Sequence, residues 1–208
     1  MRRLILTAAL IFLGTAAFAF PYATKFSDET EEYTAPVYIT NQQGDQYIKL
    51  SLGVVFPMNF PDVESLFHTD QHQLSLGGMG PVGYHYFLTG NFALGFDVGF
   101  GFNTTIGSHI LNYVPILFSV TYQPKWRMLE FPLSLNAGFA WESYNNKNYF
   151  PGLVLKPEAG VHFRIDENWS VGLEGSWMIL PQFCEWYDTG KNYTGHFFTL
   201  AAAARYYF

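Results

Sequence analysis

Apolar and polar residues alternate along most of the chain after residue 45, and this alternation predicts β-strands. The clearest stretch spans residues 92–103, where large apolar residues hold the even positions and small or polar residues the odd ones. Successive side chains of a strand point to opposite faces, so only an extended chain separates these two classes. The even face consists of Phe92, Leu94, Phe96, Val98, Phe100 and Phe102.

Seven further segments show the same period, and none of the apolar faces carries Asp, Glu, Lys or Arg. The pattern therefore predicts an all-β fold with eight strands between residues 46 and 208. The apolar positions are even in 48–56, 74–88, 114–122 and 198–208, and odd in 131–141, 153–163 and 169–179.

The volume of the apolar face predicts which way it points. The interior of an eight-stranded barrel is just wide enough for ordinary side chains, so these many bulky residues do not fit inside it. They must face outward, and so apolar an outer surface requires lipid. Because strand edges are not tolerated in hydrocarbon, the sheet must close. We therefore predict an eight-stranded antiparallel transmembrane β-barrel, an up-and-down meander.

The connections are expected to alternate in length, as they do when every second turn lies on one side of a membrane. Longer connections are predicted at 57–72, 104–112, 143–147 and 181–192, and short ones at Gly90, 124–127 and 166–168. We expect the short turns and the amino terminus on the same side of that membrane. Aromatic residues near the segment ends are candidates for two interfacial girdles, although any one of them equally fits ordinary lipid-facing bulk. These are Tyr84, Tyr86, Tyr122, Trp126, Trp141, Trp169, Trp177 and Tyr206.

The first residues have the three parts of a secretory signal peptide. Arg2 and Arg3 precede an apolar run that ends in Ala17-Phe18-Ala19, so we predict a signal peptide at 1–19, with a membrane anchor as the alternative. Residues 20–45 are acidic and lack periodicity, which predicts a flexible arm; a plug or partner-binding segment is the alternative. Cys184 is the single cysteine and has no partner within the chain for a disulfide bond.

Composition excludes two classes of protein. Of 208 residues, 49% are hydrophobic and 13% charged, whereas a disordered chain combines low hydrophobicity with high charge. The formal net charge of −6, without a basic stripe, argues against nucleic acid as a partner.

The end of the chain resembles a known group of proteins. Alternating apolar residues from Phe198 finish in Tyr206-x-Phe208, which is similar to the carboxy-terminal assembly signal of small outer-membrane barrels of the OmpW, OmpX and OmpA transmembrane-domain kind. The resemblance covers about 46–208. It implies an integral protein in the outer membrane of a diderm bacterium, with outer-membrane lipid and the insertion machinery as partners.

Charged residues on the inward face are the main candidate site. One interpretation is structural: a buried ion-pair network that fills the lumen. The other is functional: a charged constriction in a channel for small solutes. We expect Arg205 to approach both Lys49 and Glu174. The full set is Lys49, Asp97, Lys156, Glu158, Arg164, Glu174 and Arg205.

An enzymatic or metal site is not expected. His85 and His162 each have the position to meet an interior carboxylate, but no serine stands at a defined spacing to complete a triad. Barrel-embedded lipid A deacylases carry a His-x-Ser pair, whereas His196 is followed by two phenylalanines. His68 and His72 have the i, i+4 spacing of metal pairs but lack a third ligand, so we predict no cofactor.

The sequence thus predicts a non-enzymatic structural barrel, and it leaves open a narrow channel for small or hydrophobic solutes, as the resemblance to OmpW implies. The alternative is a surface-exposed adhesin that binds an extracellular ligand through its long loops. Aromatic residues in 57–72 and 181–192 fit that role, or else rest on lipid headgroups.

Overall fold

The computed structural model describes residues 40–58, 74–105, 109–144, 147–182 and 193–208. The predicted signal peptide, residues 20–39 of the predicted arm, Cys184, His68 and His72 lie outside the described residues. Among the described residues, none belongs to a helix long and apolar enough to cross a membrane. All the described residues belong to one compact unit, residues 38–208.

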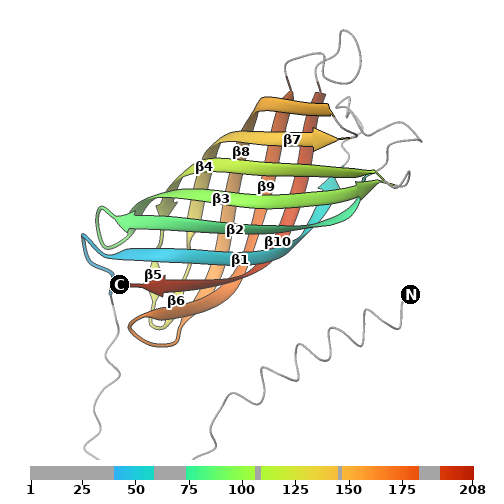
Figure 1. Ribbon diagram of the computed structural model, residues 1–208. Helices are drawn as coiled ribbons and strands as arrows, with labels where there is room; N and C mark the ends of the chain where they lie inside the picture. Colours follow the sequence, from blue (N-terminus) through green and yellow to red (C-terminus); the bar gives the residue numbers. More distant parts are fainter. Residues whose placement is uncertain (1–39, 59–73, 106–108, 145–146, 183–192) are drawn as a thin grey trace, which may run out of the picture. The chain divides into compact units, whose positions relative to one another are not determined.

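Eight long antiparallel strands form a closed barrel, which confirms the predicted fold class (Figure 1). Each strand pairs with its neighbours in sequence, and β1 pairs with β10 to close the cylinder, with Lys49 opposite Arg205. The strands are β1 (Gln46–Met58), β2 (Leu74–Phe87), β3 (Phe92–Thr105), β4 (Ile110–Tyr122), β7 (Leu133–Tyr144), β8 (Lys147–Arg164), β9 (Trp169–Gln182) and β10 (Tyr193–Tyr207).

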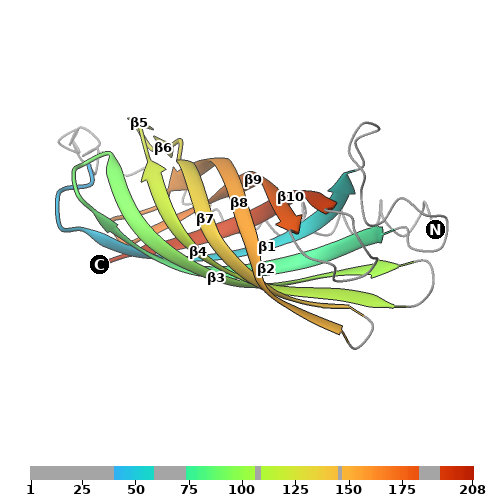
Figure 2. The same cartoon turned by 90° about the horizontal axis from the view of Figure 1, so that it is seen from above.

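A small hairpin between β4 and β7 was not predicted. It consists of β5 (Lys125–Trp126) and β6 (Leu129–Glu130), and β6 also pairs with β8 through Leu129 and Phe163. The hairpin therefore extends the barrel wall beyond the start of β7. Figure 2 shows it at the same end of the barrel as the carboxyl terminus.

The predicted alternation of connection lengths is wrong at three places. Strands β3 and β4 are separated only by residues 106–109, and β7 and β8 only by 145–146. At the opposite end, the connection from β4 to β7 spans 123–132 and includes the hairpin. Strand pairing continues through residues 103–105 and 147–149, outside the segments with clear alternation, so the pattern predicted these strands too short.

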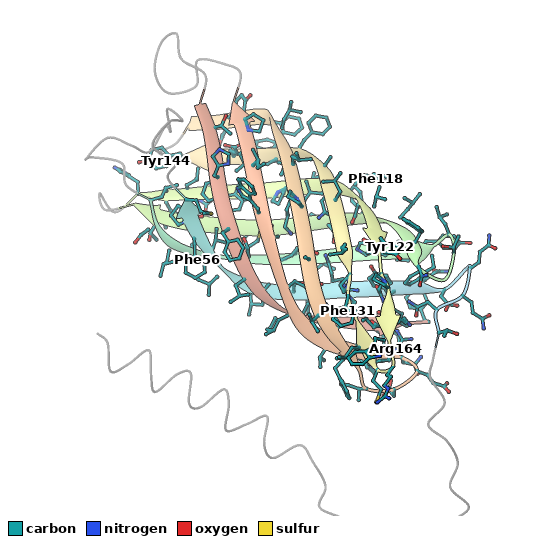
Figure 3. All side chains as sticks on the ribbon, turned by 180° about the vertical axis from the view of Figure 1, so that it is seen from behind. Phe56, Phe118, Tyr122, Phe131, Tyr144 and Arg164 are labelled. Atoms are coloured by element: carbon teal, nitrogen blue, oxygen red, sulfur yellow. The ribbon has the colours of Figure 1, made fainter. Side chains whose placement is uncertain are left out.

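The two faces of the wall are those that the alternation predicted. Leu52 is 75% exposed on the outer face, whereas its neighbour Ser51 is buried on the inner face. Phe56 and Phe118 lie on the outside of the ribbon, and Tyr144 is buried on the inside (Figure 3).

Glycines make room for the large inward side chains. His85 lies directly opposite Gly95 in the β2–β3 register, and a Cβ at Gly95 would overlap the imidazole ring. Tyr113 lies opposite Gly101 in the same way. A narrow barrel holds large residues at one position only where the facing position is small, which explains the inward glycines.

Candidate functional site: a buried charge network

Lys49 on β1 is the centre of a charge network inside the barrel. Its Nζ atom lies 2.7 Å from Oε1 of Glu158, 3.5 Å from Oδ1 of Asp97 and 3.9 Å from Oε2 of Glu174. These carboxylates belong to β8, β3 and β9, so one ammonium group joins four strands. All four side chains are buried.

Two further cations complete the network. Arg205 on β10 donates a hydrogen bond of 2.8 Å to Oε1 of Glu174, and Lys156 lies 2.8 Å from Oε2 of Glu158. Ser51 donates to the second oxygen of Glu174 at 3.1 Å. Both glutamates thus contact two cations each, which is how buried carboxylates are stabilised in the absence of water.

Arg164, the seventh predicted residue, lies in a second cluster near the hairpin. Its Nη1 is 3.2 Å from Oε1 of Glu130, and its guanidinium carbon stacks 3.4 Å from the centroid of the Tyr207 ring. Tyr207 donates to Glu130 at 2.7 Å, and Lys125 lies 3.1 Å from the same carboxylate. Burial lowers the pKa of the Lys125 ammonium, and the charge of Glu130 opposes that shift.

Gln123 connects the two clusters. Its Nε2 donates to the Tyr207 hydroxyl at 3.2 Å, and its Oε1 accepts from Arg205 at 2.8 Å. Hydrogen bonds and ion pairs therefore run without a break from Lys125 at the hairpin to Lys156 deep in the barrel.

Both interior histidines contact carboxylates. Nε2 of His85 lies 3.4 Å from Asp97, and its ring stacks on Tyr47 with centroids 4.6 Å apart. Nε2 of His162 lies 2.9 Å from Glu174. Among the described residues, no group of three or more His, Cys, Asp or Glu side chains is arranged to hold a metal ion.

Apolar side chains pack on both sides of the network. At the hairpin end, Tyr47, Phe87, Ala93 and Tyr207 form one cluster. A larger cluster fills the half toward the end of β1 and the start of β10. It comprises Val55, Met79, Leu111, Tyr113, Leu117, Ala140, Tyr144, Val154, Met178, Leu180 and Phe197.

The described part of the predicted arm packs across the hairpin end of the barrel. Asn41 is buried, and its Oδ1 accepts a hydrogen bond of 2.7 Å from Lys125. The backbone N–H of Phe87 donates to the carbonyl of Asp45 at 2.8 Å. Residues 41–45 therefore help to cover this opening.

Sequence reasoning missed Glu130, Lys125 and Gln123. Glu130 immediately precedes the alternating segment that begins at Phe131, and its even number matches the inward phase of that segment. Extending the alternation by one residue identifies it. Lys125 and Gln123 lie in a connection with too little periodicity to assign a face.

An aromatic band on β9, β10 and β2 lies on the outer surface at the hairpin end. Ring centroids are 5.0 Å apart between Trp169 and Tyr206, 6.2 Å between Tyr206 and Phe208, and 6.5 Å between Phe208 and Tyr84. The predicted assembly residues Tyr206 and Phe208 thus lie outside the barrel and belong to this band. Such a band is typical of the interfacial girdles of membrane barrels.

A protein-family model and curated relatives match parts of this chain. One protein-family model matches residues 27–206. An uncharacterized protein of Treponema pallidum is 41% identical over 101 residues, which cover 47% of this chain and 44% of that protein. An uncharacterized protein of Borreliella burgdorferi is 26% identical over 157 residues, covering 65% and 72%. This chain therefore matches less than half the length of the Treponema relative.

Among solved structures, Neisserial surface protein A is similar, with a TM-score of 0.54 and 15% identity over 79% of this chain and 99% of that one. At this identity the likeness concerns the fold alone. The chain therefore belongs to the protein family whose model matches residues 27–206, and its fold is that of the small eight-stranded outer-membrane barrels.

Proposed function

We propose that this chain is an integral outer-membrane protein, a non-enzymatic structural barrel whose lumen is closed. The observation that carries the proposal is the inverted distribution of residues. Charged side chains are buried and paired inside, whereas residues such as Leu52, Leu173 and Phe100 are more than half exposed outside. A surface of this kind is stable in hydrocarbon, where a charged residue at mid-depth costs roughly 2–4 kcal/mol.

Contacts across the lumen support a closed barrel. Lys49 on β1 reaches Glu158 on β8, three strands away around the wall. The rings of Tyr113 on β4 and Phe197 on β10 lie 5.7 Å apart, although these strands are four apart in the closed sheet. Arg205 likewise reaches Gln123, which directly follows β4. These contacts bridge the lumen at three levels.

We place the hairpin end, with the short turn 165–168, in the periplasm. The end of β1 and the start of β10 then point toward the cell surface. This orientation rests on the two longest connections, between β1 and β2 and between β9 and β10, because barrels of this kind have their longer loops on the extracellular side.

Conductance across a planar bilayer tests the proposal. A closed structural barrel gives no discrete openings at moderate voltage, while the same preparation must show folded, inserted protein. Discrete openings whose size changes in Lys156→Met would instead support a narrow channel with a charged constriction. A silent barrel that binds a cell-surface ligand, and loses it when 59–73 is replaced, would support the adhesin role.

A further inference from the structure

The hairpin β5–β6 presents apolar side chains on the outer surface of the barrel. Lys125 and Glu130 face inward, where they form an ion pair of 3.1 Å. Trp126 and Leu129 pair with each other and lie on the opposite face, beside the outward Phe163. Trp126 is 65% exposed, more than any other tryptophan that the structure describes.

The tip of the hairpin has a defined backbone geometry. Arg127 adopts a φ of 58°, and it is the only non-glycine residue with a positive φ in the described part of the chain. Its guanidinium carbon lies 5.9 Å from the centroid of the Trp126 ring. A non-glycine residue in the left-handed region costs free energy and is retained where the surrounding structure requires it. The tip therefore holds one cation next to an exposed indole.

The neighbouring turn extends the same surface. The backbone N–H of Arg164 donates to the carbonyl of Met128 at 2.8 Å, which places the tip against the start of the β8–β9 turn. Met128 and Ile165 are both exposed there, and Ile165 donates its N–H to the carbonyl of Trp169. We call Trp126, Arg127, Met128 and Ile165 the hairpin patch. Through Trp169 it is continuous with the aromatic band.

We propose that the hairpin patch binds an anionic phospholipid of the bilayer leaflet at this end of the barrel. The Arg127 guanidinium contacts the phosphate, and Trp126, Met128 and Ile165 lie among the glycerol and upper acyl groups. This inference rests on the proposed membrane location, because continuity with the aromatic band puts the patch at the depth of the headgroups. Indole rings favour that depth, and a guanidinium pairs well with phosphate.

Asp166 follows Ile165 of the hairpin patch and makes its hydrogen bonds within its own turn. The Asp166 carboxylate accepts the backbone N–H groups of Asn168 at 2.8 Å and Trp169 at 2.7 Å. It is thereby turned toward its own loop. Glu167 is also exposed in this turn, and the exposed Arg127 supplies the positive charge of the hairpin patch.

Fluorescence quenching in bilayers tests the location of the patch. The difference in emission between the wild-type chain and Trp126→Phe isolates the signal of Trp126. We expect lipids spin-labelled at the headgroup to quench this signal more strongly than lipids labelled in the middle of the acyl chain. Trp141→Phe is the matched control, since Trp141 is exposed on the outer face of β7 near the opposite end.

The Trp141 control distinguishes failure of the lipid-binding inference from failure of the proposed membrane location. If lipid quenches Trp141 but not Trp126, and aqueous acrylamide reaches Trp126 instead, the hairpin patch is a water-facing surface for a periplasmic partner and this inference is wrong. If neither tryptophan is quenched by lipid, the proposed membrane location is wrong as well.

Arg127→Gln tests the phosphate contact, with Arg127→Lys as the control that keeps the charge. The measurement is the quenching of Trp126 by spin-labelled phosphatidylglycerol relative to spin-labelled phosphatidylcholine. We expect Arg127→Gln to lower the preference for the anionic lipid by about fivefold, as loss of one basic residue near a membrane surface implies, and Arg127→Lys to retain it. An unchanged preference in Arg127→Gln would overturn the assignment of phosphate to Arg127.

Discussion

Replacing Lys49 by Met removes the central cation of the network and keeps most of the side-chain volume. Three carboxylates lie within 4 Å of the Nζ atom, and the side chain is 2% exposed. At an effective dielectric constant of about 20, two unit charges 4 Å apart attract by ~4 kcal/mol, and desolvation of both groups opposes that gain. Removing one partner of a buried pair leaves the other charge uncompensated, at a cost of about 3–5 kcal/mol. We expect Lys49→Met to lower the free energy of unfolding by that amount.

The assay is reversible urea unfolding of the chain refolded in lipid vesicles, followed by tryptophan fluorescence. Leu50→Met is the matched control, because Leu50 is the outward neighbour on the same strand and its exchange for Met should cost less than about 1.5 kcal/mol. Adding Asp97→Asn to Lys49→Met removes the carboxylate whose other ion-pair partner among the described residues is His85 alone, and should restore part of the loss. If Lys49→Met lowered the free energy of unfolding by less than about 1 kcal/mol, the loss would be no larger than that of a solvent-exposed ion pair. That result would refute a dry, closed lumen.

Four further changes test the outer face, the packing of the lumen and the assembly signal. Leu173→Arg places a charge on the outer face and should lower the free energy of unfolding in vesicles by roughly 2–4 kcal/mol, whereas no loss would contradict lipid contact. Gly95→Ala adds a methyl group against the His85 ring and should cost about 1–3 kcal/mol in the same assay. Gly80→Ala, which meets nothing closer than 3.8 Å, should be neutral or slightly stabilising. Deletion of Phe208 should reduce assembly in cells while leaving spontaneous refolding in vesicles intact; equal loss in both would make its role structural only.

The strands and their two faces were predictable because one solvent boundary acts on every residue of the wall. Leu52 must face lipid and Ser51 must not, so apolar and polar residues alternate along each strand and show which face is outward. Beyond the apolar belt this constraint ends. Residues 103–105 and 147–149 remain paired in the sheet, yet they are mostly polar, and the alternation gives no signal there.

The pairings within the lumen were harder to predict than the inward positions. Seven inward charges were identified, but which of them share a level depends on the stagger between strands. Arg205 and Lys49 are register partners, so their proximity follows from the order of the strands. The approach of Lys49 to Glu158, or of Arg205 to Gln123, depends instead on side chains that cross the lumen from distant strands. The hairpin β5–β6 has only two residues in each strand, too few for any periodic pattern.

The most direct test of the central claim is a profile of collision accessibility along the outward positions of β1. Nitroxide labels are attached one at a time in a Cys184→Ser background, in lipid bilayers. Leu52, near the middle of the strand, should show the highest collision rate with oxygen and the lowest with an aqueous nickel chelate, and the pattern should reverse toward both ends. If the chelate reached Leu52 as readily as the ends, the outer face would lie in water and the account would be contradicted. The labelled positions are Ile48, Leu50, Leu52, Val54 and Phe56.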